Sequence, residues 1–162
     1  MKNFKQLMLL VGAVAVMPAQ AADWTLRFDG VGPLKVGMRF DTVNKLLHEH
    51  MQRVPKAERP RADCFQVEPS SQPGVLLMFV KDQLRRVDVM EEGIPSDRGI
   101  ALGDPADKIT HAYGEAAKAT PGQLTVKAGS DQYAIRFEVS EGKIDAMYSG
   151  EWTEVQRQEG CQ

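Results

Sequence analysis

Two stretches of this chain follow the same order of local features: a glycine, an amphipathic helical segment, and then a pair of strand-like segments. Residues 36–47 align with residues 102–113 without a gap, so that Gly37 meets Gly103. In both stretches, apolar residues recur at positions i, i+3, i+6 and i+7, which places them on one face of a helix. These residues are Phe40, Val43, Leu46 and Leu47 in the first stretch and Ala106, Ile109, Ala112 and Tyr113 in the second. The repetition predicts one helix in each half of the folded chain.

A pair of strands is predicted after each helix. Residues 75–80 and 84–89 form such a pair in the first half, and residues 133–139 and 143–148 form one in the second. The clean alternation of apolar residues in 133–139 predicts a strand that buries one face. The expected fold class is therefore α+β, with two similar halves, each a helix followed by antiparallel strands, and with the helices packed on a strand layer. The alternative is that a glycine precedes a helix twice by chance.

Weaker signals fill in the rest of the expected fold. Apolar residues alternate in residues 24–28 and 124–126, which predicts two further short strands. Residues 52–72 are rich in proline, serine and charge, and most of this segment is expected to be loop. Asp104 stands directly before Pro105, so it is expected to cap the second helix, with the proline in the first turn.

The first 21 residues have the layout of a cleavable secretory signal. Lys2 and Lys5 form a short basic start, residues 8–17 are an uncharged apolar run, and Pro18 precedes the small-x-small sequence of residues 19–21. A run of about ten apolar residues is too short for a hydrocarbon core, which needs about 20. The alternative is an N-terminal membrane anchor. No cysteine follows the run, so a lipoprotein anchor is not expected.

Removal of this signal, residues 1–21, is expected to leave residues 22–162 as one globular domain in the periplasm or outside the cell. The two repeats of this domain are expected to cover about 22–95 and 96–162. The mature form contains no further long apolar run, so no membrane span is expected in it.

The charge of the chain argues against nucleic acid as a partner. The formal net charge is −2 at pH 7, and loss of the two signal lysines makes it about −4, without a basic stripe. One basic cluster, formed by Arg53, Lys56, Arg59 and Arg61, lies among prolines. It is interpreted as a solvated loop, with an anion site as the alternative.

The chain contains two cysteines, Cys64 and Cys161. In an oxidising compartment an even pair usually forms a bridge, so a disulfide between them is expected. Two free thiols are the alternative. Neither cysteine belongs to a CxxC sequence, which argues against a redox or zinc motif.

The histidines do not form a recognisable catalytic or metal motif. His48 and His50 are two residues apart, so on a helix they point in very different directions, and the HExxH spacing is absent. His111 falls near the end of the second predicted helix, where a structural role is sufficient. No nucleophile–base pair is recognisable either. The chain is therefore expected to be no enzyme and to carry no cofactor and no metal.

Aromatic residues outside the predicted helices are the remaining candidates for a binding site. Tyrosine, tryptophan and arginine dominate the hot spots of protein–protein interfaces. Tyr148, Glu151 and Trp152 near the C-terminus, with Trp24 at the other end of the mature chain, are the candidate contact residues. The alternative is that these aromatic rings fill the edge of the core.

Residues 36–43, and again residues 99–104, resemble a helix start of the form hydrophobic-Gly-Met-x-x-x-x-Val. This sequence is typical of β-lactamase inhibitory proteins and of the small lipoproteins of outer-membrane β-barrel assembly. The chain also resembles bacterial secreted proteins of unknown function, through Gly-x-Gly-Pro at residues 30–33 and Glu-Gly-Cys at residues 159–161.

The resemblance implies a helix pair packed on a strand layer, built as a tandem repeat. Members of these families act by binding other proteins, and they offer no catalytic residues to transfer. Two differences limit the comparison. The chain has no lipidated cysteine, and it has a single cysteine pair where β-lactamase inhibitory proteins close a short loop within each repeat. β-Lactamase is therefore not inferred as the target.

Three functions remain open from the sequence. The first is a periplasmic or secreted protein-binding module, an inhibitor or immunity-type protein that acts on a hydrolase. The second is an accessory protein of envelope assembly or structure, and the third is an unrecognised enzyme. In the first two, the partner is another envelope or secreted protein, which the sequence does not identify.

Overall fold

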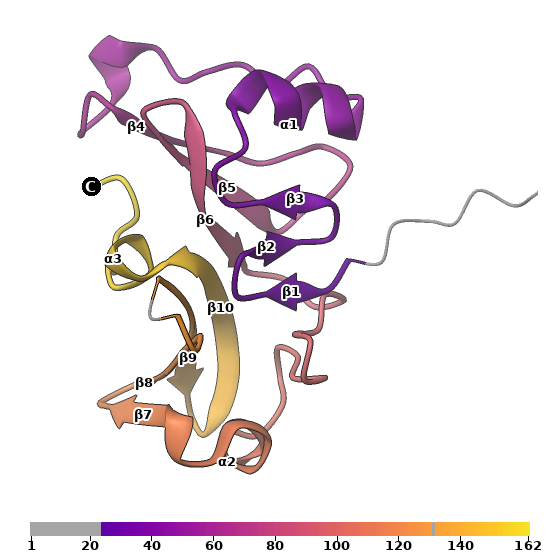
Figure 1. The fold of residues 1–162 in the computed structure, drawn as a ribbon, viewed down its shortest axis with the longest axis vertical. Coiled ribbons are helices and arrows are strands. Elements are labelled where there is room, and N and C mark those ends of the chain that lie inside the picture. Colours follow the sequence, from indigo (N-terminus) through magenta and orange to yellow (C-terminus); the bar gives the residue numbers. More distant parts are fainter. Residues whose placement is uncertain (1–23, 131) are drawn as a thin grey trace, which may run out of the picture.

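The structure is a computed structural model, and it describes residues 24–130 and 132–162 (Figure 1). The expected signal segment, residues 1–21, lies outside the described residues. Among the described residues, no helix is long and apolar enough to cross a membrane.

A seven-stranded antiparallel sheet forms the framework, with strand order β4-β5-β6-β10-β9-β8-β7 (Figure 1). Strands that are far apart in the sequence therefore meet at its centre, where β6 pairs with β10. The strands are β4 (Cys64–Val67), β5 (Val75–Val80), β6 (Gln83–Val89), β7 (Ala117–Thr120), β8 (Gln123–Lys127), β9 (Tyr133–Ser140) and β10 (Lys143–Glu151).

A small three-stranded sheet precedes the first helix, and the helices are short. The small sheet consists of β1 (Leu26–Arg27), β2 (Gly30–Val31) and β3 (Leu34–Lys35). The helical elements are α1 (Phe40–Leu47), η1 (Lys56–Glu58), α2 (Asp107–Tyr113), η2 (Gly114–Ala116) and α3 (Trp152–Val155). In Figure 1, α1 lies at one end of the molecule and α2 at the other.

The predictions of an α+β fold, of both hairpins and of both helices are confirmed. The strands β2, β3 and β7 and the helix α3 were not predicted. The prediction that Asp104 caps α2 is wrong. The helix begins at Asp107 after Ala106, and the Asp104 carboxylate instead accepts the backbone N–H of Ala101 at 2.8 Å.

One face of the large sheet packs against a continuous apolar core. Phe40 of α1 meets Phe65 of β4 and Phe79 of β5, with ring centroids 5.4 and 5.2 Å away. Val43 and Ile109, one from each of the two main helices, are fully buried in the same core. Burial of these apolar side chains is the main force that holds the helices in place.

The centre of the opposite face of the sheet is also buried, and we call it the polar face because Arg86, Asp88 and Arg136 lie there among smaller apolar clusters. On β9, Ala134 and Arg136 belong to this face, while Ile135 and Phe137 belong to the main core. The predicted buried face of β9, with Ile135 and Phe137, is confirmed, and the burial of its other face was not predicted. The cause is the C-terminal segment: Val155 of α3 packs against Ala134, so this segment covers the second face.

Two strand–helix junctions show the same backbone hydrogen bonds. At the first, the Gly37 N–H donates to Leu84 O at 2.7 Å, and the Leu84 N–H donates to Met38 O at 2.8 Å. The Phe40 N–H then donates to Asp82 O at 3.1 Å. These bonds join the start of α1 to the β5–β6 hairpin.

At the second junction, the Gly103 N–H donates to Ile144 O at 2.8 Å, and the Ile144 N–H donates to Asp104 O at 2.9 Å. The Ala106 N–H donates to Gly142 O at 3.0 Å. Gly37 and Gly103 both adopt positive φ, 92° and 81°, a conformation that residues with a Cβ rarely adopt.

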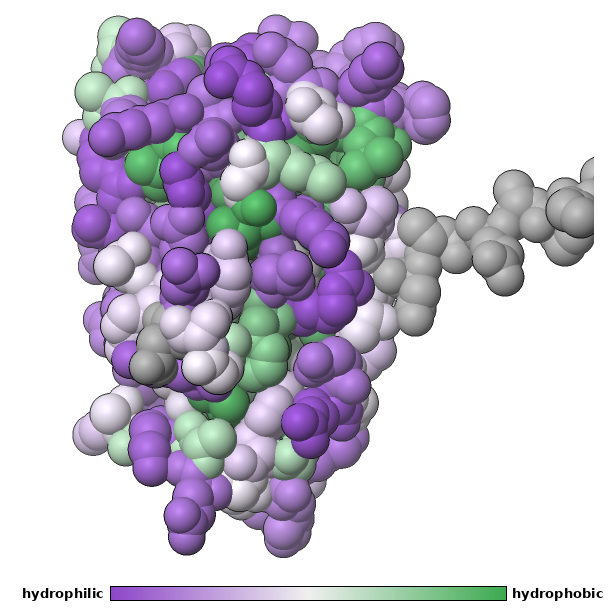
Figure 2. Space-filling model, viewed as in Figure 1, coloured by the Kyte–Doolittle hydropathy of each residue, from purple (hydrophilic) through white to green (hydrophobic). Residues whose placement is uncertain are grey.

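Hydrophilic residues dominate the face of the molecule shown in Figure 2, and hydrophobic residues form small separate areas between them. Leu46 and Met90 are the large hydrophobic residues with the greatest exposure, 42% and 44%. On the face shown in Figure 2, the hydrophobic areas are therefore small.

Candidate functional site

Trp152 is the candidate contact residue with the clearest surface position. It is half-buried as the first residue of α3, directly after β10, and its backbone N–H donates to Gln132 O at 2.8 Å, which fixes the main chain at this point. The ammonium of Lys127 on β8 lies 4.1 Å from the centre of the indole ring. A cation over an indole face is favourable, so Lys127 stabilises the orientation of the ring.

Trp152 separates two surface hollows. One has a volume of about 320 Å³ and is lined by Gln132, Tyr133, Glu151 and Thr153 beside the indole. The other, about 290 Å³, is lined mainly by small side chains and by the stems of two lysines. Its residues include Ala116, Lys118, Thr125, Lys127 and Ala128. We call Trp152 with these two hollows the Trp152 surface.

Tyr148 lies beneath this surface, in the layer of buried residues. It is 5% exposed, and its hydroxyl donates a 3.0 Å hydrogen bond to Glu138 Oε2. The guanidinium carbons of Arg136 and Arg86 lie 4.1 and 5.0 Å from its ring centre. Burial, together with the nearby Glu138 charge, raises the pKa of Tyr148 to about 12.

Glu151 and Trp24, the other two candidate contact residues, have different surroundings. Glu151, at the end of β10, accepts a hydrogen bond from Arg85 of β6. Trp24 is half-buried and packs against the main core, and its ring lies next to Gly32. Trp152 thus lines a hollow together with Glu151 and packs against the cluster that contains Tyr148, whereas Trp24 packs on a different cluster.

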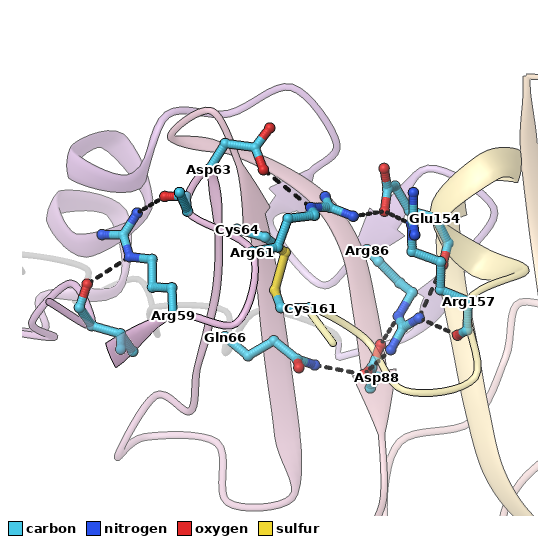
Figure 3. The surroundings of a disulfide bond; sticks show 12 residues. Arg59, Arg61, Asp63, Cys64, Gln66, Arg86, Asp88, Glu154, Arg157 and Cys161 are labelled. Carbon is cyan, nitrogen blue, oxygen red and sulfur yellow. Dashed lines mark hydrogen bonds and ion pairs between the residues drawn. A yellow bond between two sulfur atoms is a disulfide. The ribbon is translucent and has the colours of Figure 1, made fainter. Parts of the chain in front are cut away.

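The predicted disulfide between Cys64 and Cys161 is confirmed, with a Cα–Cα distance of 5.5 Å (Figure 3). It ties β4, at one edge of the large sheet, to the C-terminal segment. Arg86 adds to this attachment, because its Nη1 donates to Glu154 O at 2.9 Å and to Arg157 O at 2.7 Å. The C-terminal segment is therefore held on the polar face of the sheet by a covalent bond and by backbone contacts.

The buried arginine has a charged partner. Arg86 forms a two-bond ion pair with Asp88 on the same strand, at 2.6 and 2.8 Å, and Gln66 donates a 3.1 Å bond to the same carboxylate. Burial raises the pKa of Asp88, and Arg86 opposes this effect. A buried pair of this kind is costly to break, because removal of one partner leaves the other charge uncompensated.

A third hollow is lined by several charged residues, and it includes part of the basic cluster for which the sequence left an anion site open as the alternative to a solvated loop. It has a volume of about 480 Å³ and lies between η1, β4 and the β5–β6 turn. We call it the basic pocket. Its lining residues are Arg53, Lys56, Arg59, Ala62, Asp63, Phe65, Lys81 and Asp82.

The basic cluster noted in the sequence supplies three of the four cations of the basic pocket. Arg61 points elsewhere, with ion pairs to Asp63 at 3.1 Å and to Glu154 at 3.5 Å. Lys81 comes from the tip of a hairpin. The cluster of basic residues can be recognised in the sequence. Its proximity to Lys81 results from the fold and cannot be recognised there.

Arg53 is held firmly in this region. Its Nε lies 2.7 Å from Asp82 Oδ1, its Nη2 lies 2.8 Å from Asp41 Oδ1, and its guanidinium lies 4.3 Å from the ring centre of Phe40. These bonds lower the pKa of Asp82 below its usual value, chiefly through the hydrogen bond from Arg53.

The histidines do not converge on a metal site. His48, in a left-handed conformation with φ of 55°, ends α1, and it lines a hollow together with Glu49, His50 and Glu68. The Glu49 carboxylate is engaged by the Ser71 N–H, which lowers its pKa. Within residues 24–130 and 132–162, no three histidine, cysteine, aspartate or glutamate side chains are placed to hold a metal ion.

Neither a protein-family model nor a curated protein matches this chain. Among solved structures, it is similar to the uncharacterized protein yfeY from Escherichia coli, with 15% sequence identity and a TM-score of 0.48. The similarity covers 78% of this chain and 99% of that chain. It assigns no family.

Proposed function

We propose that this chain is a periplasmic or secreted protein-binding module, an inhibitor or immunity-type protein that acts on a hydrolase, and that the Trp152 surface contacts the partner. The observation that carries the proposal is the half-buried Trp152, held in a fixed orientation between two hollows. Tryptophan in such a position is the residue type most enriched among interface hot spots.

The scaffold supports this role because it presents Trp152 on ordered backbone. Val155 anchors α3 on the sheet, and the disulfide fixes the chain after α3. A preformed surface loses little conformational entropy when it binds, so more of the contact energy appears as affinity. The lysines in the second hollow, Lys118 and Lys127, favour a partner with acidic residues opposite them.

We also propose that the scaffold consists of two related halves, as in the tandem-repeat families that the sequence resembles. Three backbone hydrogen bonds of the Gly37 junction have counterparts at the Gly103 junction. The isolated bridge Arg39–Gln83 likewise has a counterpart in Pro105–Lys143. Counted outward from the central β6–β10 pair, the strands are β6, β5 and β4 on one side and β10, β9 and β8 on the other. Both sides therefore run backward along the chain.

An oxidising location outside the cytoplasm is part of the proposal. The disulfide favours such a compartment, because disulfides are rare in cytosolic proteins. The expected secretory signal at residues 1–21 agrees with this location.

The test is site-directed photo-crosslinking in the cell envelope, with the reactive group placed at the exposed Thr153 beside Trp152. Mass spectrometry identifies the captured protein, and its affinity for purified variants is then measured. Trp152→Ala is expected to weaken binding by more than about 1 kcal/mol, roughly fivefold. Leu46→Ala, which removes an exposed apolar side chain from α1, is the matched control and should leave binding unchanged.

Three results would count against the proposal. Binding that is unaffected by Trp152→Ala would exclude the Trp152 surface. Capture of a component of outer-membrane barrel assembly would favour the accessory role in envelope assembly. Turnover of peptidoglycan, peptides or esters by the purified protein would contradict the binding function as a whole.

A further inference from the structure

We propose that the basic pocket binds a small organic anion, with a phosphate or carboxylate group attached to an apolar body. The pocket is separate from the Trp152 surface in its lining residues, so this inference is independent of the proposed function. Its volume of about 480 Å³ falls in the range of small-molecule sites, roughly 300–1,000 Å³.

The charges of the basic pocket are not balanced. Arg53 and Arg39 are balanced by Asp82 and Asp41, and Asp63 is paired with Arg61. Lys56, Arg59 and Lys81 remain, and within residues 24–130 and 132–162 none of these three has a carboxylate at ion-pair distance. Three like charges around one hollow repel one another, and a bound anion would relieve that repulsion.

This positive site stands out because the chain as a whole carries a formal charge of −2. A basic hollow on an acidic protein attracts small anions selectively, since the rest of the surface repels them. The attraction falls with added salt, because the charges face solvent.

Arg59 is prepared for such a ligand. Its Nε donates to Val54 O at 2.7 Å and its Nη1 donates to Ala62 O at 3.2 Å, as Figure 3 shows. Its guanidinium also lies 4.5 Å from the ring centre of Phe65. The side chain is thus fixed while part of its set of N–H donors stays available for oxygen atoms of a ligand.

Ala62, which is exposed, and the aliphatic stems of the lysines give the open part of the pocket its apolar character. Phe65 also belongs to the lining, but it is 3% exposed and lies under the Arg59 guanidinium. A purely inorganic anion would leave this apolar surface in contact with water. A ligand that combines an anionic group with an apolar body covers it, and therefore fits the lining better.

Binding of phenyl phosphate to the full chain tests the proposal, with amide resonances followed by NMR and the affinity measured by calorimetry. Phenyl phosphate should shift the amides of Lys56, Arg59, Ala62 and Lys81, and added sodium chloride should weaken the binding. Phenol should not bind, and inorganic phosphate should bind more weakly than phenyl phosphate.

Variants sharpen the test. Lys56→Gln combined with Lys81→Asn should weaken phenyl phosphate binding by about tenfold, as expected for two solvent-facing charge pairs. Asparagine suits position 81, where φ is 51°. Lys45→Gln on α1 removes an exposed lysine outside the pocket and is the matched control, with unchanged affinity expected.

The full chain can also be tested on vesicles of anionic phospholipid. If it binds them and the double lysine variant does not, the source of the anion is a lipid headgroup. Phenyl phosphate binding without vesicle binding would identify a free small molecule. The proposal is overturned if phenyl phosphate leaves the pocket resonances unchanged, if phenol binds equally well, or if the double lysine variant keeps the full affinity.

Discussion

The two strand–helix junctions share a backbone pattern and differ in the side chains that support it. At the first junction, Phe40 fills the position that Ala106 occupies at the second, and its ring packs against two further rings. Arg53 then joins the helix residue Asp41 to the turn residue Asp82. The first junction is therefore stabilised by residues from several distant segments.

The second junction is stabilised locally. Asp104 accepts the Ala101 N–H and pairs with Lys108 four residues later, at 2.7 Å. The small Ala106 leaves no aromatic cluster beneath the start of α2. The comparison teaches that a glycine and three backbone hydrogen bonds define this junction, while the side chains around it are free to take other roles, such as lining a charged pocket.

The largest expected effect is the loss of stability when Phe40, the aromatic residue that distinguishes the first junction from the second, is removed. Phe40→Ala should lower the free energy of unfolding by about 3–5 kcal/mol, because it leaves a cavity in the core. Leu46→Ala on the exposed side of the same helix should cost less than about 1 kcal/mol. Chemical denaturation measures both. A loss below about 1 kcal/mol for Phe40→Ala would mean that the first junction does not depend on its aromatic cluster.

A somewhat smaller effect is expected from the disulfide between β4, which pairs with the hairpin of the first junction, and the segment that follows β10. Cys64→Ser should lower the melting temperature under non-reducing conditions, with a typical loss of about 2–4 kcal/mol. The sequence separation of 97 residues gives an upper figure of about 4.7 kcal/mol in the chain-entropy model. Wild-type protein treated with a reductant should melt like the variant.

Two thiols that titrate in the folded wild type would refute the disulfide. A melting curve that Cys64→Ser leaves unchanged would refute its contribution to stability.

Substitution of Gly37 and of Gly103 should lower the stability by similar amounts, because the two junctions have the same backbone conformation there. Gly37→Ala and Gly103→Ala should each cost about 1–2 kcal/mol, because a Cβ disfavours positive φ at either position. Gly129, which has open space around it and no positive φ, is the control, and Gly129→Ala should change the stability by less than about 0.5 kcal/mol. Unequal losses at Gly37 and Gly103, measured by denaturation, would break the comparison.

The smallest effect concerns pH. The pKa of Asp82 is lowered in the folded state, so its stabilising contribution is present above its usual pKa of about 4 and is lost as the pH falls through the lowered value. Asp82→Asn should therefore cost at most about 1 kcal/mol at pH 7, and the difference from wild type should shrink in acid. Asp104→Asn, which removes the partly exposed ion pair between Asp104 and Lys108, should cost less, about 0.2–0.5 kcal/mol.

Melting temperatures between pH 7 and pH 3 measure these differences. A gap between Asp82→Asn and wild type that grows in acid would contradict the direction of the pKa shift.

The parts of the fold that were predicted from the sequence depend on local patterns. The periodicity of residues 40–47 and the alternation of residues 133–139 are visible without any knowledge of the fold. The disulfide was predictable because two cysteines allow only one pairing. In contrast, β7 consists of residues 117–120, where only Ala117 and Ala119 alternate with polar residues, which is too short and too weakly hydrophobic a pattern to predict a strand. Pairing with β8 makes this segment a strand.

The candidate site was predictable only in part. Trp152 is visible in the sequence as an aromatic residue outside the helices. The burial of Tyr148 was not predictable, because it results from packing of the C-terminal segment over the polar face of the sheet. The basic pocket combines Lys81 from a hairpin tip with Arg59 from a loop, and no local sequence pattern indicates that these two residues are close in space.

The position of β10 at the centre of the sheet determines when the sheet can form. Residues 143–151 are synthesised after every other strand described here, yet β6 and β9 both pair with them. Until those residues are available for pairing, β6 keeps an unpaired hydrogen-bonding edge, and β4 to β6 lack half of their sheet. Completion of the fold is therefore a late event, in which β10 pairs with both β6 and β9, and until then the unpaired edge of β6 is open to incorrect pairing.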